Sequence, residues 1–232
     1  LGLGLPCGGR LYVLVEPLVA AEASIEWVTA VLEQLSLRRC MVRTVQLDTG
    51  NVTVRPCEQY IALSAGPDQM VQCFGPQMRL LLVGAGQLGH TLAELALAMD
   101  YEVIVTDPRQ QILDQWQGPA VPLLSGMPDD VVRQTADDPH SIVITLTHDP
   151  RIDDMALMEA LERDCWYVGA LGSQRTSAKR LGRLSALGLD DSALARLHAP
   201  VGLAIGSKTP MEIALAILGE LTQLRRAAER RT

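Results

Sequence analysis

The chain has 232 residues, of which 48% are hydrophobic, enough for one large domain or two small ones around a sizeable core. The formal net charge of −7 and the aromatic content of 3% disfavour a nucleic acid as the main partner, because polyanions bind basic surfaces and single strands stack on aromatic rings. No apolar run reaches the roughly 18 residues of a membrane span, so we expect no membrane association.

Residues 1–76 are predicted to form a small α+β region. The segment Asp48-Thr49-Gly50-Asn51 favours a hairpin turn between two strands. Gly66-Pro67 and Gly75-Pro76 bracket a stretch that we expect to be a linker or loop. Apolar periodicity predicts strands over 10–16, 41–47 and 52–55, and a helix over 22–37.

Residues 77–232 alternate between strand and helix patterns, which predicts a Rossmann-like α/β domain with a parallel sheet and helices on both faces. The last helix is well marked, because Thr209 is a good cap, Pro210 suits the first position and Glu212 completes a capping box. The predicted strands are 79–83, 102–106, 141–145 and 166–171, and the helices before the last lie near 87–99, 128–136, 150–163 and 174–186.

A glycine-rich turn follows the first strand of this domain. It reads Gly84-Ala85-Gly86-Gln87-Leu88-Gly89, which is G-x-G-x-x-G between a strand and a helix. Gly84 allows the tight reversal, Gly86 allows close approach of a phosphate, and Gly89 allows the helix to pack on the strand. The amides at the start of the helix, Gln87 and Leu88 included, would face the anion.

Asp107 ends the next strand and has two possible roles. Its carboxylate could accept hydrogen bonds from ribose hydroxyls, as acidic residues at this position do in dinucleotide-binding domains. Because Pro108 follows, Asp107 could instead cap the next helix with the proline at its first position. The residues alone leave both roles open.

Further polar residues follow later strands, where ligands bind in open parallel sheets. Thr147-His148-Asp149 follows the strand 141–145, and His148 is either a catalytic group or the residue before a helix cap. Gly172 and Ser173 precede a helix and could receive an anion with Arg175 nearby, although Ser173 could simply cap that helix. A basic run, Lys179-Arg180 with Arg183, continues the same helix.

The five cysteines are scattered and odd in number, which is typical of reduced thiols in the cytoplasm. No Cys-x-x-Cys or His-x-x-x-His pair occurs, and we expect no structural zinc or other metal site. Cys7 lies between Pro6 and two glycines, so its thiolate could attack, carry sulfur or bind a soft metal, or it could be a small residue in a turn. The others are Cys40, Cys57, Cys73 and Cys165.

These motifs together resemble the XdhC/CoxI family, the accessory proteins of xanthine dehydrogenase and related molybdenum hydroxylases. The similarity spans nearly the whole chain. It rests on Cys7 to Arg10, Gly84 to Gly89, Asp107-Pro108-Arg109, Thr147-His148-Asp149, Tyr167 to Ser173 with Arg175, and His198-Ala199-Pro200 through Pro210. Family members usually carry a further glycine–cysteine segment upstream, so we expect the first region to be incomplete.

The resemblance implies that the protein holds the molybdenum cofactor as cargo while a cysteine desulfurase supplies its sulfido ligand, and then delivers it to an apo-hydroxylase. Cys7 would contact the molybdenum or the sulfur, and Arg109 would join the cofactor-binding residues. A homodimer would help to shield the cofactor. Two other hypotheses fit the glycine turn: an NAD(P)-dependent oxidoreductase with His148 as the proton relay, and a nucleotide-sensing module without chemistry.

Overall fold

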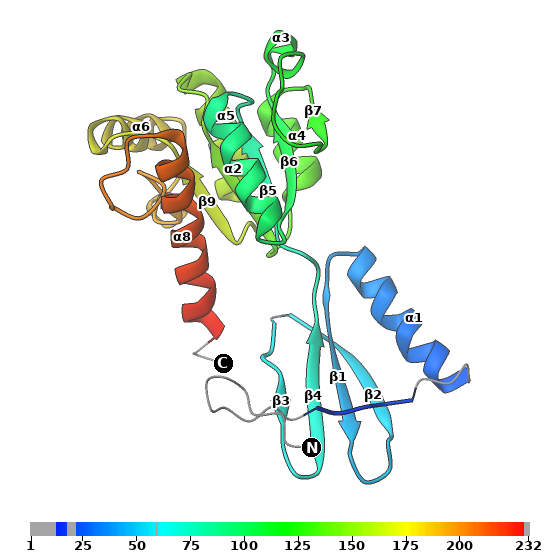
Figure 1. The fold of residues 1–232 in the computed structure, drawn as a ribbon. Coiled ribbons are helices and arrows are strands. Elements are labelled where there is room, and N and C mark those ends of the chain that lie inside the picture. The colour runs from blue at the N-terminus through cyan, green and yellow to red at the C-terminus, as the bar shows by residue number, and fades with distance from the viewer. Residues whose placement is uncertain (1–12, 18–21, 59, 230–232) are drawn as a thin grey trace.

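The computed structural model describes residues 13–17, 22–58 and 60–229, and these form two parts joined end to end, each with a sheet and helices (Figure 1). The small antiparallel sheet ends with β4 at Phe74, and the parallel sheet begins with β5 at Arg79. These two strands lie on either side of the predicted division between residues 76 and 77. Cys7 lies outside the described residues.

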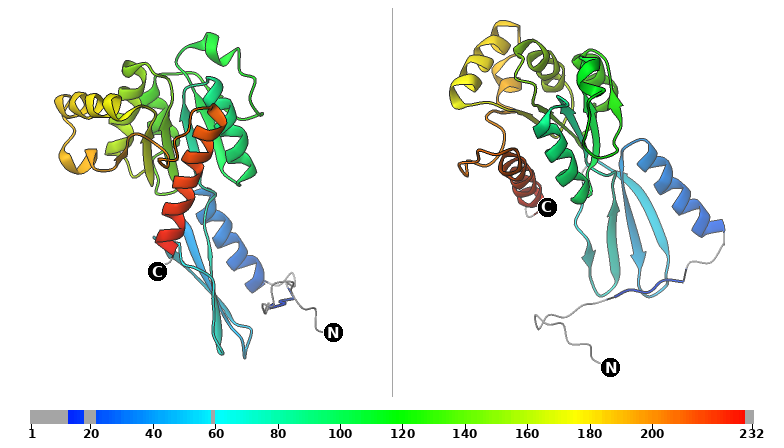
Figure 2. Two further views of the ribbon diagram at one scale, coloured as in Figure 1. Left: turned by 60° about the vertical axis from the view of Figure 1, so that its left-hand side comes forward. Right: turned by 45° about the horizontal axis from the view of Figure 1, so that its top comes forward.

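The first part is a four-stranded antiparallel sheet with one helix. Its strand order is β2 (Val52–Cys57), β1 (Cys40–Gln46), β4 (Gln69–Phe74) and β3 (Ser64–Ala65). Helix α1 (Glu22–Ser36) lies along one face of this sheet in both views of Figure 2. The contact is aromatic and cationic, because Trp27 stacks on Phe74 at 6.5 Å and the Arg43 guanidinium lies 4.5 Å from the Trp27 ring centroid.

Two predictions for this part are wrong. Residues 13–16, the described part of the predicted strand 10–16, form no strand. The stretch bracketed by Gly66-Pro67 and Gly75-Pro76 is not a linker, because it contains β4, which pairs with β1 over six residue pairs. The Gly66 amide donates to the Gln69 carbonyl in the turn between β3 and β4, so the first Gly-Pro pair marks a hairpin.

The second part is a six-stranded parallel sheet with the order β10-β9-β8-β5-β6-β7. This is the doubly wound order, in which the chain starts in the middle and builds outward in both directions. Its strands are β5 (Arg79–Val83), β6 (Glu102–Thr106), β7 (Leu123–Leu124), β8 (Ser141–Thr145), β9 (Tyr167–Ala170) and β10 (Leu197–His198).

Helices cover both faces of this sheet, as the sequence predicts. One core cluster joins α2 and α8 to the sheet, and Leu80, Leu92 and Ile217 are fully buried in it. The other joins α4, α5 and α6, with Leu81, Leu157 and Leu184. The helices are α2 (Gln87–Ala98), α3 (Gln110–Leu113), α4 (Pro128–Thr135), α5 (Pro150–Glu162), α6 (Gln174–Ala186), α7 (Asp191–Leu194) and α8 (Pro210–Glu229).

A cluster of ion pairs joins the two parts. Arg38, two residues after the end of α1, has a positive φ of 55° and directs its guanidinium to residues of the second part. Its Nε donates to Asp138 at 2.7 Å and its Nη1 to Glu102 at 3.0 Å. Because the side chains of Arg38 and Asp138 are each only 16% exposed, the bond between them is shielded from water and holds the small sheet against the parallel sheet.

Candidate functional site

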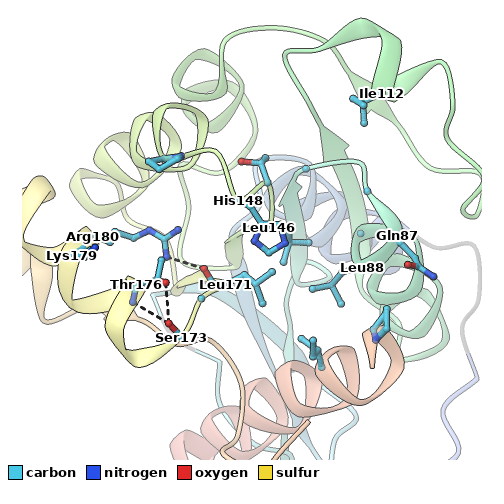
Figure 3. A pocket seen from close by; sticks show the side chains of 18 of the residues that line it. Gln87, Leu88, Ile112, Leu146, His148, Leu171, Ser173, Thr176, Lys179 and Arg180 are labelled. Carbon is cyan, nitrogen blue, oxygen red and sulfur yellow. Dashed lines mark hydrogen bonds between the residues drawn. The ribbon is translucent and has the colours of Figure 1, made fainter. Parts of the chain in front are cut away.

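A cavity of about 930 Å³ opens at the carboxyl ends of the central strands (Figure 3). It lies beside β5 and β8, where the strand order reverses and where doubly wound folds bind their ligands. The glycine turn after β5, the loop after β8 and the start of α6 contribute to its wall, and Pro210 and Ile213 of α8 complete it. The volume falls in the range of small-molecule and cofactor pockets.

A side chain would meet different surroundings at each of the three glycines of the turn. Gly84 has a φ of +125°, and a side chain there would also come within 3.0 Å of the Thr147 methyl group. A Cβ on Gly89 would lie 2.5 Å from the Gly84 carbonyl oxygen, so only glycine lets α2 start so close to β5. A Cβ on Gly86 would meet nothing of the described chain within 4 Å, and this residue lines the cavity.

Gly86 is the N-cap of α2, and as a glycine it supplies no side-chain acceptor to the first amides of the helix. No acidic residue lies in the first turn of α2 either. A helix start without a capping side chain has amide donors and a positive dipole end available for an anion. Gln87 and Leu88 line the cavity beside it (Figure 3).

Asp107 lies behind the turn and is fully buried. Its carboxylate accepts from the Ala85 amide at 3.2 Å and from the Arg109 amide at 3.0 Å. The Arg109 guanidinium adds two further bonds of 2.8 Å. Burial alone would raise the pKa of Asp107, but the side-chain and backbone bonds from Arg109 and the Ala85 amide outweigh it and lower the pKa.

These contacts bear on both roles left open for Asp107. It is not the N-cap of α3, since that helix begins at Gln110 with Arg109 as its N-cap, and Pro108 lies outside it. It also does not line the cavity, whereas Arg109 does. Both carboxylate oxygens hold the glycine turn and Arg109 in place, so the structure gives Asp107 a positioning role.

The loop after β8 brings His148 to the cavity in a strained conformation. His148 is exposed and has a φ of +63°, which is uncommon for a residue with a side chain. The neighbouring residues hold it there: the Thr147 hydroxyl donates to Asp153 at 2.7 Å, and Asp149 caps α5 by accepting from the Arg151 amide at 3.0 Å. Figure 3 shows His148 beside Leu146 in the wall of the cavity.

The start of α6 forms the opposite wall. Ser173 is the N-cap of this helix and accepts from the Thr176 amide at 3.2 Å, so its hydroxyl serves the helix. Arg180 lies one turn further on and is only 3% exposed, yet it also lines the cavity. It donates to the Leu171 carbonyl and to Asp153, both at 3.0 Å, which ties α6 to the end of β9 and to α5.

The cavity is cationic. Arg109, Arg180 and Arg183 each pair with an aspartate that lies outside the cavity lining, namely Asp107, Asp153 and Asp154. Arg175 and Lys179 are exposed and form no ion pair within the described part of the chain. Among the described residues no carboxylate lines the cavity. Such a lining attracts an anion, and two of its cations are free to bind one.

The structure thus brings ten of the predicted cofactor-binding residues around one cavity and leaves Asp107 behind it. The basic run Lys179-Arg180 with Arg183 also lines the cavity, although the sequence analysis did not include it among the site residues. The signal was its spacing, since Arg175, Lys179 and Arg183 recur at four-residue intervals and therefore share one face of the helix. The residues placed are Gly84, Gly86, Gln87, Leu88, Gly89, Arg109, His148, Gly172, Ser173 and Arg175.

Residues 80–221 match the family model of the XdhC Rossmann domain. The chain belongs to the XdhC family. Both the resemblance and the fold class predicted from the sequence are thereby confirmed, with a Rossmann-like parallel sheet preceded by a small α+β part.

Named relatives agree with this membership. The chain is 31% identical over 160 residues to a Bacillus subtilis protein named as a probable xanthine dehydrogenase subunit, covering 68% of this chain and 46% of that protein. It is 26% identical over 221 residues to the molybdenum cofactor insertion chaperone PaoD of Escherichia coli, covering 95% of this chain and 61% of that protein. The chain therefore spans less than two thirds of the length of these curated relatives.

A crystal structure described as a xanthine dehydrogenase from Bacillus halodurans has the same fold. It superposes with a TM-score of 0.73 at 23% identity, covering 91% of this chain and 70% of that one. The match therefore includes the small antiparallel sheet as well as the Rossmann domain. Within the described residues, no helix combines the length and apolar character needed to cross a lipid bilayer.

Proposed function

We propose that this protein binds the molybdenum cofactor in the cavity beside the glycine turn and assists its sulfuration and its insertion into a xanthine dehydrogenase-type hydroxylase. The observation that carries the proposal is the lining of the cavity. In an XdhC Rossmann domain, an open glycine turn and five cationic side chains face one space with no carboxylate among the described residues. The names of the two curated relatives support the same role.

The lining fits the cargo. The cofactor carries a phosphate on a pyranopterin, and the first amides of α2 together with Arg175 and Lys179 are suited to hold that phosphate. Apolar side chains occupy the rest of the wall and suit a flat ring system. They are Leu88, Ile112, Leu146, Leu171 and Ile213.

Two further parts of the proposal concern residues and partners beyond the cavity. Cys7 would supply a thiolate to the molybdenum or to the sulfur delivered by a cysteine desulfurase. The apo-hydroxylase would receive the loaded cofactor, and a homodimer in the cytoplasm would shield the cofactor until then. Because the role of Cys7 and that of the cavity rest on different residues, they can be tested separately.

An NAD(P)-dependent oxidoreductase is the competing function, and the position of Asp107 weighs against it. A dinucleotide-binding domain presents an acidic side chain to the ribose at this point of the fold. Here both oxygens of Asp107 are engaged by Ala85 and Arg109, and the residue is fully buried. Ribose binding would have to break these bonds.

The deciding experiment is an anaerobic titration of the purified protein with molybdenum cofactor and, separately, with NAD and NADP. We expect tight, saturable binding of the cofactor and none of the nicotinamide nucleotides at comparable concentrations. Micromolar NAD binding together with reduction of NAD by a substrate would overturn the proposal.

The thiolate role needs a delivery assay. Cys7→Ala and wild-type protein, each loaded with cofactor, are mixed with an apo-hydroxylase and a desulfurase, and hydroxylase activity is followed. We expect the variant to bind the cofactor normally and to yield less active hydroxylase. Equal yields would show that Cys7 contributes nothing to sulfuration or transfer, while the cavity would remain the binding site.

A further inference from the structure

Three cysteines that are far apart in the sequence meet on one face of the small sheet. Cys40 and Cys57 are directly opposite each other on β1 and β2, and Cys73 on β4 is opposite Val42. Since Cys40 and Val42 point to the same face of β1, all three thiols do so. Their Sγ atoms lie within 4.8 Å of one another, and those of Cys57 and Cys73 are 3.7 Å apart.

An imidazole from the second part of the protein lies against one thiol of the group, Cys40, outside the set of three ligand atoms that are all within 4.8 Å of one another. His140 precedes β8, and its Nε2 lies 3.2 Å from the Cys40 Sγ. Its Nδ1 is buried without a hydrogen-bond partner among the described residues, 3.8 Å from an oxygen of Asp138. Burial lowers the pKa of His140, with Arg38 adding to the effect and Asp138 opposing it, so the ring is neutral and can offer a lone pair.

Three thiols and one imidazole are a structural zinc ligand set. Two sulfurs on one tetrahedral zinc lie about 3.8 Å apart, given a Zn–S length of ~2.3 Å, and the observed 3.7 Å agrees with this spacing. We propose that Cys40, Cys57 and Cys73 bind one zinc ion, or a similar thiophilic cation, and that the His140 ring turns from its contact with Cys40 to become the fourth ligand, so that the metal joins the small sheet to the Rossmann domain. This site is independent of the cofactor cavity.

A carboxylate also lies near His140, as is common for histidines that bind metals. A ligating histidine usually directs its other nitrogen at a carboxylate, and the Asp138 carboxylate lies 3.8 Å from the Nδ1 of His140, near it but beyond hydrogen-bond distance. Asp138 is itself held by the Arg38 guanidinium at 2.7 Å and by the Ser141 hydroxyl at 2.8 Å. The contacts that join the two parts therefore converge on the proposed metal.

Protonated thiols or a disulfide are the alternatives for this cluster. Burial raises the pKa of Cys40 to about 11 and that of Cys57 to about 12, with neighbouring thiols adding to both shifts, so without a cation these groups keep their protons at neutral pH. Zinc would displace the protons. A Cys57–Cys73 disulfide is disfavoured, because strands two apart are separated by about 10 Å and a disulfide needs Cα atoms within ~7 Å. Cys40 and Cys57 could form one.

The test starts with the reduced, metal-free chain and adds Zn²⁺ or Co²⁺ under anaerobic conditions. Native mass spectrometry should show one zinc per chain. Cobalt should give the thiolate-to-metal charge-transfer band and the intense visible bands of a tetrahedral site, and protons should be released on binding. A folded, reduced chain that takes up neither metal would overturn the proposal, and so would a Cys40–Cys57 disulfide found by alkylation of freshly isolated protein.

Variants identify the ligands. Cys57→Ser and Cys73→Ser should each weaken zinc binding by more than about 100-fold, beyond the 10–100-fold loss that follows when only a residue supporting a ligand is changed. His140→Gln should keep the thiolate charge-transfer band of cobalt and change its visible bands. The control is Cys165→Ser, because the Cys165 thiol donates to the Ala136 carbonyl at 2.8 Å, outside the cluster, and its loss should leave uptake unchanged.

Circular dichroism shows whether each variant is folded. A folded Cys57→Ser or Cys73→Ser chain that keeps wild-type zinc affinity would overturn the assignment of that residue. Should these variants fail to fold, the cobalt spectrum of the wild-type chain still decides, because a site built from these residues must show thiolate ligation.

Discussion

Replacement of Gly86 by valine separates ligand binding from folding more cleanly than any other change in the cavity. Gly86 has a φ of −84° and a ψ of −173°, which a β-branched residue adopts readily. A Cβ there would meet nothing of the described chain within 4 Å, so the isopropyl group would project into the cavity without a steric cost to the fold. Gly86→Val should therefore crowd the ligand alone.

The effect on stability combines a change in helix capping with an opposing change in the entropy of the unfolded chain, and the effect on binding comes from lost hydrogen bonds to the phosphate. Valine is a poorer N-cap than glycine, which destabilises the fold by about 1 kcal/mol. Valine also restricts the unfolded chain more than glycine does, which stabilises the fold by a similar amount. The unfolding free energy should therefore change by less than about 1 kcal/mol. Each lost hydrogen bond from an amide to a charged phosphate costs about 1.5–3 kcal/mol. That is a Kd increase on the order of 10- to 100-fold.

Anaerobic titration with molybdenum cofactor measures the Kd, and urea unfolding measures the stability. Gly182→Ala is the control, since Gly182 lies on α6 with open space around it and does not line the cavity. Gly89→Ala is the contrast, because its Cβ would lie 2.5 Å from the Gly84 carbonyl oxygen and should cost about 1–3 kcal/mol of stability. A Kd for Gly86→Val within about threefold of wild type would refute the phosphate position.

Three other changes test the surroundings of the turn. Arg175→Ala should weaken cofactor binding about tenfold and reduce its salt dependence in the same titration, whereas Arg39→Ala, which removes an exposed arginine outside the cavity, should not. Asp153→Ala should lower the unfolding free energy in urea by about 3 kcal/mol, because it leaves the buried Arg180 with only its longer, 3.6 Å contact to Asp154, and an unchanged value would contradict that pairing. The pKa of Asp107 is lowered from 3.8, so its carboxylate stabilises the fold above that pH and loses this effect as the pH falls through the folded-state pKa. The stability difference between wild type and Asp107→Asn should accordingly be constant between about pH 7 and 5 and shrink below about pH 4, and a difference that grows with acid would contradict the sign.

The elements that the sequence predicts best are those whose signals are local. The strand, turn and helix around Gly84 to Gly89 lie where periodicity places them, and so does the final helix. Its capping box is formed as expected: the Glu212 amide bonds the Thr209 hydroxyl, and the Glu212 carboxylate accepts from the Thr209 amide at 2.9 Å. In each case the residues that decide the structure lie within one turn of each other, so no tertiary information was needed.

The features that the sequence did not predict depend on distant partners. Strand β4 was hidden because Gly-Pro pairs flank it, and only its pairing with β1 makes it an inner strand of the sheet. The two-residue β10 exists through its bonds to β9. In the sequence Arg180 is only one member of a basic run, yet the fold buries it against Asp153. The thiol cluster has no local spacing at all, because its members lie on three different strands.

Strand β8 separates the two proposed sites and makes them independently testable. His140 precedes β8, at the junction with the small sheet, while the loop that carries His148 follows it at the cavity. The strand has five fully buried residues, so the two ends lie about 17 Å apart on a rigid element. A metal at one end would hold the two parts together without touching a ligand at the other. Removal of zinc should therefore lower the melting temperature of the chain and leave the Kd for the cofactor unchanged, whereas Gly86→Val should do the reverse. If chelation abolished cofactor binding while the chain stayed folded, the two sites would be coupled through β8, and the purely structural role proposed for the metal would be wrong.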